Sequence, residues 1–166
     1  LDYNTSIVGI QLNGNDDVEK DLMEAIDFRT GLNRQPTTLK NMVPLLTAND
    51  PSATNLNLAD STTLNYSVLA KVLAGNDTLT SLNLSNVALG DTGAGVIGGL
   101  VKTKTKLKSL FMCCNSISIH GVKHLIEDGL LQNKSITELS LRGNRIGDDA
   151  ARLLKEMLKG NDYLTT

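Results

Sequence analysis

The chain has 166 residues, enough for one domain, and its 40% hydrophobic and 20% charged residues are typical of a globular protein. A formal net charge of −2 gives no long-range attraction to nucleic acid or to an anionic membrane, and the longest apolar runs are far too short to span a bilayer. We therefore expect neither nucleic acid nor a membrane among the partners.

The first 35 residues carry one strand-like pattern followed by a strongly polar helix pattern. Ile7, Ile10 and Leu12 point one way from an extended run, and Asn15 follows in a turn. Residues 16–33 then predict a helix with one acidic side and one apolar side. An array of stacked units needs a terminal element with one apolar face and one polar, solvent-exposed face, so this segment is predicted to be an end cap. An ordinary surface helix with a solvated side is the alternative.

Residues 36–166 repeat one strand-and-helix unit. A helix is expected from about Thr38, with Pro44 kinking or shortening it. Units then start near residues 53, 79, 107 and 136, at intervals of 26, 28 and 29 residues, and a partial unit starts at residue 164. Within each unit the apolar spacing changes from alternation to helical periodicity. A strand and a helix this short cannot bury their apolar faces alone, so the units must stack.

The repeated pattern LxxLxLxxNxL, followed by Gly or Ala and a full helix, resembles the ribonuclease-inhibitor-like class of leucine-rich repeats. That class also includes NLR sensors, the GTPase activator of Ran, and tropomodulin. Two of the copies are Leu79, Leu82, Leu84, Leu89 and Gly93, and Leu107, Leu110, Met112, Asn115, Ile117 and Gly121. The resemblance covers nearly the whole chain. It implies a single α/β domain, a leucine-rich repeat solenoid with parallel strands on the concave face and helices on the convex face.

The two ends of the chain suggest an unusual order. Residues 1–7 have the same spacing as the joints at residues 73–79, 130–136 and 158–164, where a helix ends and the next strand begins. A cap-like segment thus lies near the start, while the finish is a strand that has only begun. We expect that residues are missing or that segments are joined out of spatial order, because residues 1–35 fit better after Thr166. The alternative is an excerpt from a longer array with an irregular repeat at residues 16–37.

The polar residues inside the repeats indicate structural roles rather than catalysis or ligand binding. Asn15, Asn115 and Asn144 occupy the motif position whose amide can bond backbone groups of neighbouring turns, which predicts a structural Asn ladder. His120 and His124 have a spacing that suits a metal, but no carboxylate or thiol stands at ligand spacing to complete a site. The glycine-rich stretch at residues 90–99 lacks the context of a phosphate-binding loop and is expected to permit close packing. We predict no catalytic residue, no cofactor and no metal.

The residues between the buried leucines alternate outward onto the concave face. Phe111 is a large ring where its neighbours are small and polar, and aromatic and Arg side chains dominate the binding energy of interfaces. The alternative for this ring is that it covers a gap between coils. We predict a partner-binding patch, with these candidate residues: Phe111, Arg142, Glu138, Lys108, Cys113 and Asn83.

The predicted function is a non-catalytic scaffold or regulatory module that binds another protein through the concave face or the array ends, as part of a larger chain or complex. Cys113 and Cys114 are adjacent and poorly placed to bridge each other, and free thiols fit a reducing compartment. Despite five glycosylation-type triplets, at Asn4, Asn65, Asn76, Asn83 and Asn133, we expect a cytoplasmic location, cytoskeletal or ciliary.

Two alternatives follow from the resemblance. A GTPase activator of the Ran-activator type would rely on a catalytic arginine, and Arg142 and Arg145 are the only arginines in the regular strands and turns. The other alternative is a cytoskeletal component, which is either ciliary or caps actin filaments as tropomodulin does. An actin-capping protein would use the cap-like helix at residues 16–33 to contact actin.

Overall fold

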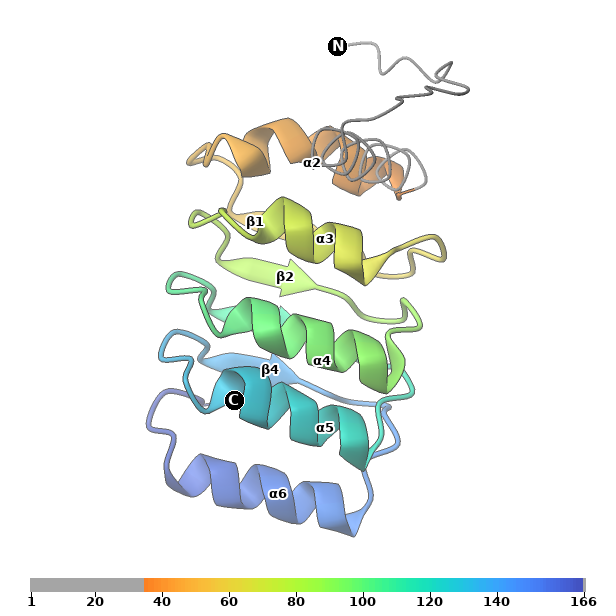
Figure 1. The fold of residues 1–166 in the computed structure, drawn as a ribbon, viewed down its shortest axis with the longest axis vertical. Helices are drawn as coiled ribbons and strands as arrows, with labels where there is room; N and C mark the ends of the chain where they lie inside the picture. Colours follow the sequence, from red (N-terminus) through yellow and green to blue (C-terminus); the bar gives the residue numbers. More distant parts are fainter. Residues whose placement is uncertain (1–34, 166) are drawn as a thin grey trace, which may run out of the picture.

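A computed structural model describes residues 35–165 as one row of alternating strands and helices (Figure 1). One parallel sheet has the order β1-β2-β3-β4, formed by β1 (Asn55–Asn57), β2 (Ser81–Asn83), β3 (Ser109–Phe111) and β4 (Glu138–Ser140). The helices form a second layer and are α2 (Thr37–Thr47), α3 (Tyr66–Leu73), α4 (Gly90–Val101), α5 (Ile119–Leu125), the π-helical η1 (Ile126–Leu130) and α6 (Asp148–Lys159). The predicted parallel solenoid is confirmed. The expectations for Ile7–Leu12, Asn15 and residues 16–33 lie outside the described residues.

The register of the sheet aligns equivalent positions of successive units. Leu56 pairs with Leu82, Leu82 with Leu110, and Leu110 with Leu139. Because side chains alternate along a strand, these leucines share one face, which packs under the helices, while their neighbours point to the opposite, concave face. The first three leucines of this column are buried, and they join the helix residues in one apolar cluster.

Close approach of α4 to α5 and η1 depends on glycine. A Cβ added at Gly98 would lie 3.0 Å from the backbone oxygen of His124 and 3.1 Å from the Cα of Leu125, and one added at Gly121 would lie 2.5 Å from the Asp91 carboxylate. Such distances leave no room for a side chain, so the glycine-rich sequence permits the tight contact that was expected of it. The first helix of the described residues, α2, contains Pro44 and continues past it to Thr47.

The joints before β2 and β4 each hold a buried Asn whose side chain reaches the end of the helix in the preceding unit. Asn76 Nδ2 donates to the carbonyl oxygen of Leu46 at 2.8 Å, and Asn133 Nδ2 donates to that of Val101 at 2.7 Å. These contacts satisfy carbonyl groups that a helix end leaves without intrahelical partners. Because both Asn side chains are buried in these bonds, two of the five glycosylation-type triplets are inaccessible in the fold.

Lys104 occupies the same place in the joint before β3. Its Nζ donates to the carbonyl oxygens of Leu73, Ala74 and Asn76, the last at 2.6 Å. Burial lowers the pKa of Lys104, and the charge of Asp77 opposes that effect. This lysine therefore acts as a cap on the end of α3, in place of the Asn that the joints before β2 and β4 use.

Among residues 35–165, no helix combines the length and apolar character that crossing a bilayer requires.

Candidate functional site

The turns that follow the strands are tied together by two motif asparagines. Asn115 is fully buried, and its Oδ1 accepts from the N–H groups of Val87 at 3.0 Å and Leu89 at 3.2 Å. Asn144 Oδ1 accepts from the N–H groups of Asn115 at 2.9 Å and Ile117 at 3.1 Å. Each amide also donates to two carbonyl oxygens, so each Asn makes four bonds to backbone. These bonds fix the turns at the carboxyl end of the sheet relative to one another.

Phe111 lies in the concave face between small polar residues of the neighbouring strands. It pairs in register with Asn83 on β2 and with Ser140 on β4. Glu138 and Arg142 stand two residues before and after Ser140, so alternation puts them on the same face and diagonal to the ring. The structure thus brings Phe111, Asn83, Glu138 and Arg142 together, and we call these four residues the concave patch.

Charge in the concave patch is available to a partner. Within residues 35–165 neither Glu138 nor Arg142 forms a side-chain ion pair, whereas pairs such as Arg152 with Asp149 at 2.7 Å lie on the helices. Arg142 is exposed, and Glu138 is half-buried. An unpaired charge on each side of an aromatic ring is an arrangement that a protein partner can complement.

Two other predicted patch residues are placed differently. Cys113 is half-buried beside the patch, with its Sγ 3.1 Å from the Ser140 Oγ, and both cysteines are free thiols. Lys108 is exposed but precedes Ser109, so it falls outside the alternating set of β3 that includes Phe111. Its backbone oxygen accepts from Thr137 and Glu138. Lys108 therefore borders the patch at the joint.

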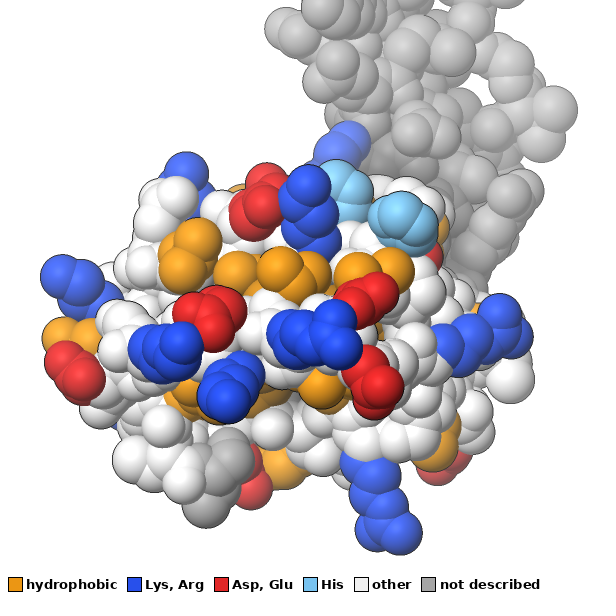
Figure 2. Space-filling view, turned by 90° about the horizontal axis from the view of Figure 1, so that it is seen from below, with side chains coloured by type: hydrophobic (Ala, Val, Ile, Leu, Met, Phe, Trp, Pro, Cys, Tyr) orange, Lys and Arg blue, Asp and Glu red, His pale blue; other side chains and the backbone are white. Residues whose placement is uncertain are grey.

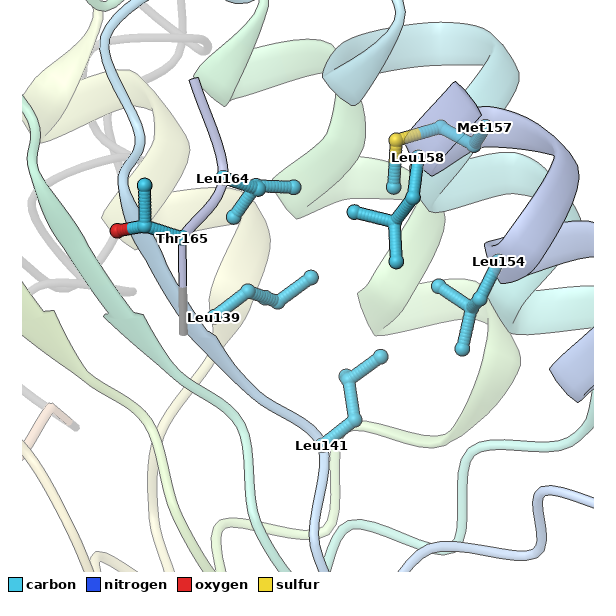
Figure 3. Close-up of a pocket in the computed structure, with 7 residues that line it drawn as sticks. All are labelled: Leu139, Leu141, Leu154, Met157, Leu158, Leu164 and Thr165. Carbon is cyan, nitrogen blue, oxygen red and sulfur yellow. The ribbon is translucent and has the colours of Figure 1, made fainter. Parts of the chain in front are cut away.

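The end of the array beyond β4 has an apolar groove of about 330 Å³ (Figure 3). Leucines from β4, the following turn and α6 point into this space, and the last residues of the chain close one side. The lining residues are Leu139, Leu141, Leu154, Met157, Leu158, Leu164 and Thr165. The N–H of Thr165 donates to the carbonyl oxygen of Thr137 at 2.9 Å, as Thr137 does to Lys108 in the preceding unit. We call this surface the end groove.

Seen from the α6 end, hydrophobic side chains lie exposed among charged ones (Figure 2). Leu158 of the end groove is 48% exposed. The repeat pattern predicts the leucines of this unit as core, because apolar spacing alone does not show how far neighbouring units cover each side chain.

The two histidines lie on the opposite side of the molecule from the sheet. His120 and His124 line a hollow of about 300 Å³ between α4 and α5, together with Asp91. Burial acts to raise the pKa of Asp91, but hydrogen bonds from the Ser118 N–H and Oγ, both at 2.7 Å, lower it overall. The described part of the chain contains no group of three or more His, Cys, Asp or Glu side chains that could hold a metal ion.

Stacked parallel strand-and-helix units around an aliphatic column define a solenoid repeat protein. A family model described as Leucine Rich repeat matches residues 75–98 and 132–155, each range running from a joint through strand and turn into the helix. These two segments of the chain therefore match leucine-rich repeats.

The chain is similar in sequence and structure to several known leucine-rich repeat proteins. Ribonuclease inhibitor of Sus scrofa is 37% identical over 99 residues, which cover 58% of this chain and 21% of the inhibitor. Leiomodin-2 of Gallus gallus is 28% identical over 130 residues, which cover 73% of this chain and 23% of leiomodin-2. The solved structure titled Leiomodin-1 Actin-Binding Site 2 has a TM-score of 0.70 and 25% identity, and the match covers 78% of this chain and 77% of that chain. The predicted ribonuclease-inhibitor-like resemblance is confirmed. The chain spans between a fifth and a quarter of the length of these two curated relatives.

Proposed function

We propose that this chain is a protein-binding module of an actin-based assembly in the cytoplasm, and that it binds actin through the concave patch. The observation that carries the actin proposal is the likeness to the leiomodin-1 actin-binding site, which extends over more than three quarters of both chains. The sequence similarity to leiomodin-2 agrees with that structural likeness. These relatives favour the cytoskeletal alternative over a GTPase activator.

The concave patch supports the choice of face. Phe111 is the one large ring among small residues such as Ser109 and Ser140, so a partner can approach it without displacing bulky neighbours. The Asn115 and Asn144 bonds hold the strand ends rigid, which limits the conformational entropy that binding would cost. An aromatic anchor with an exposed Arg beside it is the composition that dominates interface energetics.

The test is a titration of fluorescently labelled monomeric actin, kept unpolymerised, with the purified chain. The double variant Phe111→Ala/Arg142→Ala should bind at least about tenfold more weakly, because interface anchors contribute roughly 2 kcal/mol or more. The matched control is Leu131→Ala/Arg152→Ala, which removes an exposed apolar side chain and an exposed Arg from the convex side and should bind like the original chain.

Two results would contradict the proposal. If the original chain does not bind actin, the actin assignment is wrong. If actin binds the concave double variant as tightly as the original, while circular dichroism shows all proteins folded, the concave patch is not the binding surface.

A further inference from the structure

The joints between each helix and the next strand lie together along one edge of the array, on the left in Figure 1. Two neighbouring joints on this edge, residues 102–108 before β3 and residues 131–137 before β4, contain four exposed lysines and no acidic residue. The joints on either side of them carry Asp77 and Asp162. We call the four exposed lysines the basic edge: Lys102, Lys106, Lys108 and Lys134.

The lysines of the basic edge have no partner within the described fold. Their ammonium groups form no ion pair and no hydrogen bond within residues 35–165. Lys104, in the same joint, turns inward instead and donates to backbone carbonyl oxygens. On the helices, Lys123 pairs with Glu127 and Lys159 pairs with Glu156. The positive charge of the basic edge is therefore available to a ligand.

Helix capping accounts for only part of this cluster. Lys102 is the C-cap residue of α4, where a positive charge interacts favourably with the helix dipole. That effect falls off beyond the last turn of a helix. Lys106 and Lys108 follow Lys102 by four and six residues, close to the start of β3. Their charges therefore have no structural role that the fold explains.

Buried polar groups hold the backbone beneath the basic edge in one arrangement. The carbonyl oxygen of Lys104 accepts from Asn133 Nδ2 at 2.8 Å and from Ser135 Oγ at 2.7 Å, which ties the two joints together. The N–H of Lys108 donates to the carbonyl oxygen of Thr80 at 2.7 Å. Neighbouring strands lie about 4.8 Å apart, so one ligand can reach lysines of both joints. Binding would then order only side chains, which limits its entropy cost.

We propose that the basic edge binds a short acidic segment of a partner protein, with Asp or Glu side chains that match the four lysines. Lys106 and Lys108 are exposed on either side of the buried Leu107, and their Cα atoms are at most roughly 7 Å apart. Alternate carboxylates of an extended peptide have the same spacing. The basic edge borders the concave patch at Lys108, but this proposal does not rest on actin binding.

A protein segment fits the basic edge better than a nucleic acid does. Two joints extend over roughly 10 Å, the width of two strand spacings. A nucleic acid brings a phosphate with every nucleotide, so a longer strand would continue onto the joints that carry Asp77 and Asp162. Glu138 also lies beside the edge, because its N–H donates to the carbonyl oxygen of Lys108. The positive charge thus suits a short cluster of carboxylates.

The test is fluorescence anisotropy of a rhodamine-labelled oligoglutamate peptide titrated with the full chain. The peptide should bind at about 100 mM salt and bind more tightly at lower salt, because screening is weaker there. The edge variant, Lys102→Gln/Lys106→Gln/Lys134→Gln, should bind about tenfold more weakly, because three exposed ion pairs of modest strength are lost together. Lys108 is kept, so the border of the concave patch is unchanged.

The matched control is the helix variant, Lys71→Gln/Lys123→Gln/Lys155→Gln, which removes the same charge from exposed lysines on α3, α5 and α6. It should bind within about twofold of the original, because charges farther from the ligand than the Debye length of about 10 Å are screened. All substituted side chains are exposed, so both variants should fold, which circular dichroism checks.

Four results would overturn the proposal. They are no binding of oligoglutamate by the original chain, equally tight binding of an oligoglutamine peptide, an unchanged affinity of the edge variant, and an equal loss in both variants. Tighter binding of an oligothymidylate of the same length would overturn it in favour of a nucleic acid. None of these results bears on the actin proposal, whose test uses actin and the Phe111→Ala/Arg142→Ala variant.

Discussion

The third and fourth units of the array share one motif but differ in their surroundings. Leu110 and Met112 of the third unit are 0% exposed, while the equivalent Leu139 and Leu141 of the fourth are half-buried. Leu110 and Leu139 are register partners on strands of equal length, and Met112 and Leu141 each follow two residues later. The difference shows that, in a solenoid, a leucine is buried by the unit that follows it rather than by its own unit. Within residues 35–165 the fourth unit is therefore less completely packed than the third.

The largest effect that separates these units should come from truncating their central leucines. Leu110→Ala leaves a cavity in a fully packed column and should lower the free energy of unfolding by about 3 to 4 kcal/mol. Leu139→Ala removes a side chain that water already reaches, so it should cost about 1 to 2 kcal/mol. Urea denaturation followed by circular dichroism measures both, at a concentration where the chain is monomeric. Equal losses would show that the fourth unit is packed as the third is.

A smaller contrast is expected between the two ladder asparagines, which each make four bonds to backbone. Asn115→Ala leaves buried N–H and carbonyl groups without hydrogen-bond partners and should lower the free energy of unfolding by about 2 to 3 kcal/mol. Water can replace the amide in Asn144→Ala, which should lower it by about 1 kcal/mol. Asn55→Ala is the control, because this exposed side chain on β1 forms no hydrogen bond within residues 35–165 and its loss should stay within about 0.5 kcal/mol. The same urea series decides the order, and a larger loss at Asn144 than at Asn115 would refute it.

The strand leucines explain why the fold was predictable. Spacing such as Leu79, Leu82 and Leu84 fixes which side chains point inward, and the repeat period forces parallel stacking. Alternation also placed Phe111 on the concave face correctly, but it did not separate Lys108, whose position at a joint falls outside the alternating strand.

Features set by neighbouring units were harder to predict. Lys104 sits where other joints have Asn, and only the fold reveals that its long side chain reaches the carbonyl groups ending α3. The end groove was missed for the reason that the third and fourth units illustrate. Its leucines carry the same pattern as buried ones, and exposure depends on a following unit that sequence spacing does not specify.

The central functional claim, that the concave patch binds a protein, is tested most directly by hydroxyl-radical footprinting of the chain with and without monomeric actin. Phe111 reports on the concave face, Leu131 on the convex side and Tyr163 on the terminal joint, and the last two are exposed in the free chain. The account predicts that actin protects Phe111 from oxidation and leaves Leu131 and Tyr163 unchanged. Protection of Leu131 or Tyr163 with Phe111 still reactive would contradict it.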